Sequence, residues 1–278
     1  MSDRYCVIGN PVEHSRSPWI HARFAEQTGE PVAYGKRLAP PDGFAATVRR
    51  FRDEGGRGCN VTVPFKFEAA ALADSLAPRA RLAGACNTLC FDGERVFGDN
   101  TDGYGLAADI AAAGVELAGR DLLLVGAGGA AAGVLGPLLD AGPRRIVIAN
   151  RTAHRAQALA DSHAAVAAAG GAELTACGLA DIAGTFDVVV NATASSLGGA
   201  EVPVPARVLR PGALAYDMMY GPAAQAFLAW AGRHGALARD GLGMLVEQAA
   251  ESFRVWRGVR PQTAPVLAQL RALLAAGG

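Results

Sequence analysis

Short apolar runs alternate with helix-forming stretches along the second half of the chain. Four of these runs read as buried strands: residues 121–125 (DLLLV), 145–150 (RIVIAN), 186–190 (FDVVV) and 213–217 (ALAYD). Each run is short, mostly apolar and bounded by glycine or polar residues, as expected for a strand inside a sheet. The alternation predicts parallel strand–helix–strand units with helices covering both faces of the sheet.

The first hundred residues show a more mixed pattern. Strands are predicted at 4–8 (RYCVI), 58–63 (GCNVTV) and 87–91, with a helix near 66–76. Ser17 followed by Pro18 is typical of a helix N-cap and first helical position, and Gly29 is a stop signal. Another helical run opens at Asp102 and ends at Gly114. The change of pattern near 102–105 predicts a domain boundary, and a chain of 278 residues is long enough for two domains.

The composition excludes several classes of protein. The formal net charge is zero, so no basic excess is available for a nucleic-acid surface. No run reaches the roughly 20 apolar residues of a membrane span, and the N-terminus lacks the pattern of a signal peptide. The five cysteines form no C-x-x-C pair, so neither a disulfide framework nor a metal site is indicated. We therefore expect a cytoplasmic protein without nucleic-acid or membrane partners.

The predicted strand 121–125 leads directly into a glycine-rich turn made of Gly126, Ala127, Gly128, Gly129 and Ala130. Glycines allow a tight turn and let backbone N–H groups approach a pyrophosphate, which then lies at the positive end of the following helix. Glycine-rich turns also serve packing alone. The strand–turn–helix context favours a dinucleotide.

The end of the next predicted strand distinguishes between the two nicotinamide cofactors. An acidic residue there would bind the ribose 2′-hydroxyl of NAD. This chain instead has Asn150, Arg151 and Thr152, with Arg155 three residues further on. Two guanidinium groups and no carboxylate favour the 2′-phosphate of NADP. The alternative, two solvated arginines at a helix start, is disfavoured because cations are poorly placed there.

Lys66 is unusual because only two of the 26 cationic residues are lysines, the other being Lys36. Arginine is not deprotonated in proteins, whereas lysine can give up a proton. Lys66 also opens a predicted helix, where a cation needs a partner. Together with Asp102, it would provide the acid and the orienting carboxylate that reduction of a carbonyl group requires. A surface charge and a helix cap are the ordinary alternatives for these two residues.

Other polar residues lie close to predicted turns in the first part of the chain. Ser15 and Ser17 precede a helix, where hydroxyls and free N–H groups can bind a small carboxylate. Thr62 lies near the carboxyl end of the predicted strand 58–63, the edge where open α/β sheets collect ligands. Asn87 adds an amide in the segment GACNTL. An ordinary structural role would explain two of these residues equally well: helix capping for Ser17, and a position in a strand for Thr62.

Eight motifs spread over nearly the whole chain resemble the shikimate dehydrogenase family. In order they are GNPVEHSRSP, NVTVPFK, AGACNTL, GDNTDG, GAGGA, NRT, DMMYGP and DGLGMLVEQAA. The family reduces 3-dehydroshikimate to shikimate with NADPH, on the route to chorismate and the aromatic amino acids. The resemblance implies an α/β substrate-binding domain (1–102), a Rossmann-type NADP-binding domain (103–240) and C-terminal helices (241–278) that return to the first domain.

The resemblance also implies roles for the residues that match these motifs. Lys66 and Asp102 are the implied catalytic pair. The implied substrate-binding residues are Ser15, Ser17, Thr62, Asn87, Tyr220 and Gln248. The implied cofactor-binding residues are Gly126, Ala127, Gly128, Gly129, Ala130, Asn150, Arg151, Thr152, Arg155, Met218 and Gly241. From the residues alone, Gln248 reads as a helix amide and Tyr220 as a loop aromatic, so their roles depend on the resemblance.

Several alternatives stay open at this stage. The same fold could serve a quinate/shikimate or aminoshikimate dehydrogenase with another cofactor preference, or a non-catalytic NADP-binding sensor. Pro78 and Gln225 depart from the family pattern, outside the proposed chemistry. The sequence does not fix the oligomeric state, and a homodimer stays open.

Overall fold

The computed structural model describes residues 2–193 and 204–276, and the chain folds into two compact units. The first unit contains residues 1–105 and 245–278, and the second contains residues 106–244. Both crossings between the units fall inside helices, α5 (Asp102–Ala112) and α9 (Leu242–Arg257). The C-terminal helices therefore belong to the same unit as the N-terminal residues.

The first unit is built on a six-stranded mixed sheet with the strand order β2-β1-β3-β5-β6-β4. Its strands are β1 (Asp3–Gly9), β2 (Val32–Leu38), β3 (Gly56–Val61), β4 (Ser75–Leu76), β5 (Thr88–Asp92) and β6 (Arg95–Asp99). Strand β1 is parallel to both β2 and β3. Strand β5 is antiparallel to β3 and to β6, with which it forms a hairpin, and β4 is parallel to β6.

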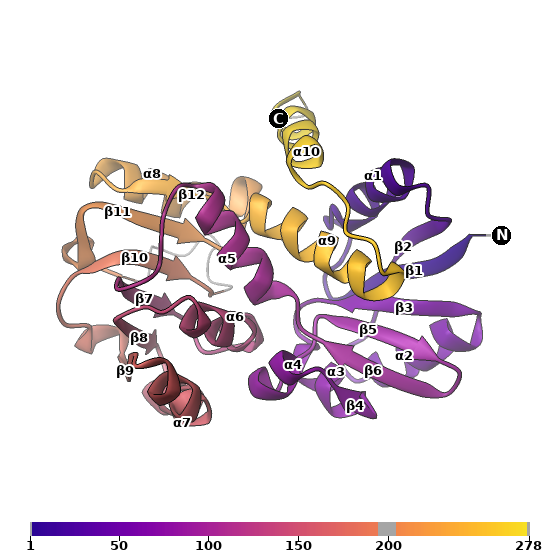
Figure 1. Ribbon diagram of the computed structural model, residues 1–278, viewed down its shortest axis with the longest axis horizontal. Coiled ribbons are helices and arrows are strands. Elements are labelled where there is room, and N and C mark those ends of the chain that lie inside the picture. Colours follow the sequence, from indigo (N-terminus) through magenta and orange to yellow (C-terminus); the bar gives the residue numbers. More distant parts are fainter. Residues whose placement is uncertain (1, 194–203, 277–278) are drawn as a thin grey trace. The chain divides into compact units, whose positions relative to one another are not determined.

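Helices cover both faces of this sheet (Figure 1). The unit's other helices are α1 (Ser17–Thr28), α2 (Phe44–Asp53), α3 (Lys66–Leu72), α4 (Pro78–Ala83) and α10 (Ala264–Ala276). Residues from α2, α3 and α4 form a buried apolar cluster with one face of the sheet. On the other face, aromatic residues of α1 and α9 pack together: the rings of Phe24 and Phe253 lie 5.9 Å apart.

Successive side chains of a strand point to opposite faces of the sheet, so neighbouring residues belong to different layers. Cys6 and Cys59 belong to the apolar cluster below α2. Tyr5 instead stacks on Trp256 of α9, with ring centroids 4.5 Å apart. Asn60 follows Cys59 and therefore points toward α9, where it donates a hydrogen bond to Ser252. The face under α9 thus carries Asn60, a buried polar residue of this sheet.

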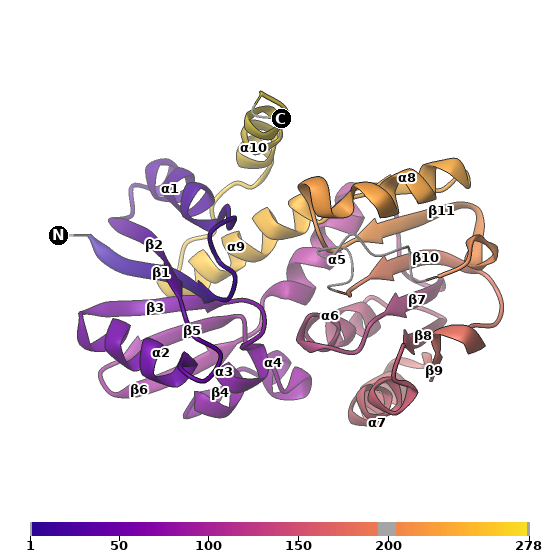
Figure 2. The same cartoon turned by 180° about the vertical axis from the view of Figure 1, so that it is seen from behind.

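The second unit is a six-stranded parallel sheet with the strand order β12-β11-β10-β7-β8-β9. The strands are β7 (Asp121–Val125), β8 (Arg145–Asn150), β9 (Glu173–Gly178), β10 (Phe186–Asn191), β11 (Leu209–Asp217) and β12 (Leu237–Arg239). The α-helices are α6 (Gly129–Asp140), α7 (Ala153–Gly170) and α8 (Gln225–Arg233), and the short 3-10 helices are η1 (Leu179–Asp181), η3 (Ala206–Val208) and η4 (Gly221–Ala224). Numbered from β7, this is the Rossmann order, in which ligands collect where the strand order reverses, between β7 and β10. Figure 2 shows α6 and α8 on opposite faces of the sheet.

Three predicted boundaries in the first unit are wrong. Ser17 is the first residue of α1 and Arg16 is the N-cap, without a side-chain capping bond. The helix predicted near 66–76 ends at Leu72, because Ala73 is extended and β4 follows. The strand predicted at 58–63 begins at Gly56 and ends at Val61, so Thr62 lies just beyond it. Strands β2 and β6 and helix α2 were not predicted.

Among the described residues, none of the helices is long and apolar enough to cross a membrane. The same residues contain no group of three or more His, Cys, Asp or Glu side chains arranged to hold a metal ion.

Candidate active site

Lys66 and Asp102 are in direct contact in the first unit. Lys66 is the first residue of α3, and Asp102 is the first residue of α5. The Lys66 ammonium (Nζ) donates a hydrogen bond to Asp102 Oδ2 at 2.5 Å, and the two side chains are only 15% and 6% exposed. The carboxylate offsets the unfavourable placement of a cation in the first turn of a helix. The pair is a proton donor held in place by a buried acceptor.

Asn87 and Gln248 complete this group. Asn87 Nδ2 lies 2.9 Å from Asp102 Oδ1, and it also lies 3.1 Å from Gln248 Oε1. Gln248 Nε2 donates one hydrogen bond to Leu245 O, at 3.0 Å. An amide nitrogen carries two protons, so Gln248 keeps one donor for another partner. Four of the predicted residues, from α3, α5, α9 and the segment before β5, are therefore linked by hydrogen bonds.

The two predicted serines form a separate pair. The Ser15 hydroxyl lies 3.2 Å from the Ser17 hydroxyl and accepts a hydrogen bond from the Ser17 backbone N–H at 3.3 Å. Because Arg16 provides no side-chain cap, the start of α1 has N–H groups and hydroxyls together, which suits a carboxylate. The Thr62 backbone N–H donates to Ile8 O at 2.9 Å. Its hydroxyl makes no hydrogen bond within the described part of the chain.

An ion-pair network fixes the segment that leads to Asp102. Arg79 donates two hydrogen bonds of 2.7 Å to the Asp99 carboxylate and one of 3.0 Å to Glu251. Arg254 also binds Glu251, and this hydrogen bond lowers the pKa of that carboxyl group against the opposing effect of burial. Asp99 Oδ1 accepts the Asn100 N–H, and Asn100 Oδ1 accepts the Asp102 N–H. The backbone at Asp102 is thus held by a chain of charged and amide groups.

No local sequence pattern singles out Arg79 or Glu251. Pro78 occupies the first turn of α4, where proline is favoured, and so starts the helix that carries Arg79. Thr88 and Thr101 also belong to the hydrogen-bonded group around Asn87. Both threonines lie inside motifs quoted above, Thr88 in AGACNTL and Thr101 in GDNTDG. The spacing of these motifs alone does not reveal which hydroxyl faces which amide.

The glycine-rich turn of the second unit fits a pyrophosphate. Gly126 follows β7 with φ of 113°, and a Cβ atom there would lie 3.1 Å from the Ala192 backbone. Gly128 is the N-cap of α6, without a side-chain capping bond, so the N–H groups of this 12-residue helix stay open to a ligand. A Cβ atom on Gly128 would meet no atom of the described residues within 4 Å, so they leave the space beside the turn open. The described residues thus leave a cradle of backbone donors.

The segment after β8 carries two cations that have no acidic partner in the described part of the chain. Asn150 ends β8, and its Nδ2 donates to Thr152 O at 3.0 Å, which shapes the turn before α7. Thr152 is the N-cap of α7, and Arg155 lies in the first turn of that helix. The side chains of Arg151 and Arg155 are exposed, and neither forms an ion pair with a described residue. These observations fit a group with two negative charges at this position.

Met218 and Gly241 come together in the second unit. The Gly241 N–H donates to Met219 O at 2.8 Å, and a Cβ atom on Gly241 would lie only 2.3 Å from Met218 O. The close approach of these backbones explains why position 241 is glycine. Tyr220 immediately precedes η4, also in the second unit. Its expected contact with the substrate stays a prediction.

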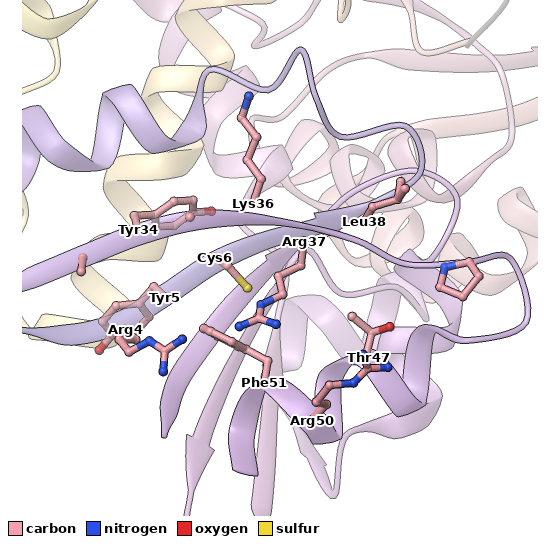
Figure 3. Close-up of a pocket in the computed structure, with 13 residues that line it drawn as sticks. Arg4, Tyr5, Cys6, Tyr34, Lys36, Arg37, Leu38, Thr47, Arg50 and Phe51 are labelled. Atoms are coloured by element: carbon pink, nitrogen blue, oxygen red, sulfur yellow. The ribbon is translucent and has the colours of Figure 1, made fainter. Parts of the chain in front are cut away.

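A cavity of about 840 Å³ lies elsewhere in the first unit, at β1, β2 and α2 (Figure 3). Two of the cations that line it already have an acidic partner within the protein. Arg4 and Arg37 both form ion pairs with Glu54. Figure 3 shows Lys36 pointing away from Arg37, and its Nζ donates to a backbone carbonyl of the β1–α1 loop. Arg50 lies in the last turn of α2, a favourable place for a cation. None of the predicted site residues lines this cavity.

Three family models match the chain in succession. The shikimate dehydrogenase substrate binding domain matches residues 7–89, and the shikimate / quinate 5-dehydrogenase model matches residues 106–198. The shikimate 5′-dehydrogenase C-terminal domain matches residues 241–271.

Similar proteins have the same length and fold. The NADP(+) shikimate dehydrogenase of Acidovorax sp. (strain JS42) is 67% identical over 99% of this chain and 98% of its own. That of Methylibium petroleiphilum is 66% identical over 98% of this chain and 95% of its own. The crystal structure of shikimate 5-dehydrogenase from Thermus thermophilus in complex with NADP(H) and shikimate is 33% identical. It superposes with a TM-score of 0.84 and covers 97% of this chain and 99% of that one. This chain therefore belongs to the shikimate dehydrogenase family.

Proposed function

We propose that this protein reduces 3-dehydroshikimate to shikimate with NADPH, in the pathway to chorismate and the aromatic amino acids. The observation that carries the reaction class is the 2.5 Å contact between the Lys66 ammonium and the Asp102 carboxylate. The substrate and the cofactor follow from the relatives, which are NADP(+) shikimate dehydrogenases over nearly the full length of the chain.

The chain's own residues supply the proton for the reduction. Hydride addition to a carbonyl carbon leaves negative charge on the oxygen, which must then receive a proton. Lys66 donates that proton and becomes a neutral amine, and Asp102 holds it in position throughout. NADPH, when bound, supplies the hydride. In the reverse direction, the neutral Lys66 accepts the proton of the alcohol.

The remaining polar residues bind and orient the two molecules. Ser15 and Ser17 hold the substrate carboxylate, helped by Tyr220. Thr62, Asn87 and Gln248 bind the ring hydroxyls and the reacting oxygen.

On the cofactor side, the backbone of residues 126–130 binds the pyrophosphate. Arg151 and Arg155 bind the 2′-phosphate, with Asn150 and Thr152 shaping their turn, and Met218 and Gly241 lie against the nicotinamide. These assignments combine the contacts described above with the family motifs.

Quinate is the second candidate substrate, because one matching family model describes shikimate and quinate 5-dehydrogenases together. Initial rates of oxidation with shikimate and with quinate, each with NADP and with NAD, separate the candidates. We expect the highest kcat/KM for shikimate with NADP. A higher kcat/KM for quinate, or for NAD, would contradict the proposed substrate or cofactor. Tight binding of NADPH without turnover of any of these acids would favour a sensor.

A further inference from the structure

A group of buried polar side chains lies between the sheet of the first unit and helix α9. It consists of Asn60, Thr88, Thr101 and Ser252, which adjoin Asn87 and Gln248 of the candidate site. Thr88, Thr101 and Ser252 are completely buried. Burying a hydroxyl costs free energy unless it is hydrogen-bonded, so each of these groups needs a defined partner. Their partners include the amide of Asn87.

The hydroxyl of Thr88, the first residue of β5, is the centre of this group. It lies 2.9 Å from Asn87 Oδ1 and 2.8 Å from Ser252 Oγ, and it accepts a hydrogen bond from Asn60 Nδ2 at 3.2 Å. A hydroxyl has a single proton to donate. The amide oxygen of Asn87 can only accept, so its contact with the Thr88 hydroxyl requires the Thr88 proton. Thr88 therefore gives its proton to Asn87.

This hydrogen bond acts together with the Thr101 backbone N–H to fix how the Asn87 amide is turned. Its oxygen accepts from the Thr88 hydroxyl and from the Thr101 backbone N–H, the latter at 2.8 Å. Its nitrogen consequently faces Asp102 Oδ1, to which it donates at 2.9 Å. If the amide were rotated by half a turn, two oxygen acceptors would face each other beside the carboxylate that holds Lys66. That arrangement would lose the hydrogen bond and add repulsion.

We propose that Thr88 is a positioning residue for the reduction: its hydroxyl keeps the Asn87 amide turned toward Asp102. Thr88 does not touch Lys66, so it acts through Asn87. The inference rests on the proposed function and deepens it, because it explains how the Asp102 carboxylate keeps one orientation beside the proton donor.

Two substitutions of Thr88 separate its hydroxyl from its shape. Thr88→Val keeps the shape of the side chain and removes the hydroxyl, whereas Thr88→Ser keeps the hydroxyl. We expect Thr88→Val to lower kcat about tenfold, the equivalent of one ordinary hydrogen bond. We expect Thr88→Ser to stay within about twofold of the wild type, and the Kd for NADPH to stay unchanged in both. If Thr88→Val does not fold, Thr88→Cys replaces it, because a thiol is a weak donor and should also lower kcat.

A matched control removes a different hydroxyl of the same group. Ser252→Ala takes away one partner of Thr88 but leaves the Thr88–Asn87 bond in place. We expect this variant to lose thermal stability, as Thr88→Val does, while its kcat stays within about twofold of the wild type. If Thr88 and Ser252 only stabilised the fold, Thr88→Val and Ser252→Ala would both lower Tm and kcat together.

A double-mutant cycle with Asn87→Ala tests whether Thr88 acts through Asn87. We expect Thr88→Val to have no further effect on kcat once Asn87 is truncated. The role of Thr88 would be overturned by wild-type kcat in Thr88→Val, by equal losses in Thr88→Val and Thr88→Ser, or by the same loss in the Asn87→Ala background. No turnover of 3-dehydroshikimate by the wild type would overturn the proposed function, and with it the role of Thr88.

Discussion

Lys66 differs from its surroundings in a chain that uses arginine almost everywhere. Its ammonium contacts Asp102 at 2.5 Å, and both groups are largely buried. An arginine could form the same ion pair, and with two parallel hydrogen bonds. What arginine cannot do is give up its proton near neutral pH. The proposed proton transfer would therefore account for lysine at this position, whereas charge alone would not.

We expect Lys66→Ala to lower kcat at least about hundredfold, the low end of the range for loss of a general acid. Lys66→Arg is expected to lower kcat to a similar extent although it keeps the positive charge beside Asp102. NADPH should still bind to both variants, since Lys66 belongs to the first unit and the cofactor residues belong to the second. Steady-state kinetics measure kcat, and a fluorescence titration measures the Kd for NADPH.

Lys36 offers a matched control for this experiment. It is the other lysine of the chain, and its ammonium donates to a backbone carbonyl instead of a carboxylate. Lys36→Ala is expected to keep kcat within about twofold of the wild type, as an exposed substitution away from the site. Near-normal kcat in Lys66→Arg would show that charge, not proton transfer, is what position 66 provides.

Arg151 and Arg155 should decide the choice between NADP and NAD. Each charge-assisted hydrogen bond to a phosphate contributes about 1.5–3 kcal/mol, so replacing both arginines by alanine removes about 3–6 kcal/mol and should lower kcat/KM for NADP by roughly 100- to 10,000-fold. The value for NAD should hardly change, because NAD lacks the 2′-phosphate. Arg233→Ala, at an exposed arginine of the same unit, serves as the control. Equal losses with both cofactors would argue against a role in recognising the phosphate.

At the scale of elements, the second unit was the more predictable one. The runs 121–125, 145–150 and 186–190 coincide with β7, β8 and β10, because strands buried on both faces are apolar throughout. The first unit was harder to predict. Strand β2 contains Gly35, Lys36 and Arg37 and lies at the edge of its sheet, where such residues are tolerated. No continuous apolar run marks it.

The candidate site was predictable only where a residue type was out of place. Lys66 is conspicuous among arginines, and Arg151 is conspicuous where an acid is common. Gln248 lies 161 residues after Asn87 in the sequence, and nothing local shows that α9 returns to the first unit. Thr88 reads as an ordinary strand residue until the direction of its hydroxyl is known. Contacts between distant segments depend on the fold as a whole.

Helix α1 buries a histidine whose protonation opposes folding. His21 is completely buried, and its ring stacks on Tyr34 with centroids 4.1 Å apart. Neither ring nitrogen has a hydrogen-bond partner among the described residues. Burial lowers the pKa of His21 to about 3, because the imidazolium would lose its hydration.

This shift makes the stability of the first unit sensitive to acid. The unfolded chain, with a histidine pKa of about 6.5, takes up the proton first as the pH falls. The stabilisation is therefore complete above about pH 6.5 and is lost progressively toward pH 3. Between pH 7 and pH 5, the wild type should lose about 2 kcal/mol more unfolding free energy than His21→Leu. Urea unfolding at both pH values measures the difference, and equal losses would contradict this account.

At the scale of the whole molecule, the chain leaves the first unit in α5 and returns to it in α9. The returning segment contributes large parts of that unit's interior. Phe253 is fully buried against α1, and Trp256 stacks on Tyr5 of β1. Ser252 and Gln248 bind the polar residues beneath them. Residues 1–105 therefore lack part of their own core.

A chain that ends at residue 241 should not form a stable first unit. Loss of the buried Phe253 side chain alone costs about 3–5 kcal/mol, and loss of the partly buried Trp256 adds to this cost, so the truncation removes much of a typical stability of about 5–15 kcal/mol. Hydrogen exchange should show rapid exchange throughout β1, β3 and β5 in the shortened chain. Slow exchange in these strands, as in the full chain, would show that α9 is dispensable for the fold.

The proposed reaction is the reduction of 3-dehydroshikimate with NADPH. The most direct test measures the loss of NADPH absorbance with the purified full-length protein and quantifies the shikimate formed in the same reaction. We predict that NADPH is consumed and shikimate appears in equal amounts. An unchanged absorbance, or NADPH consumption without formation of shikimate, would contradict the account.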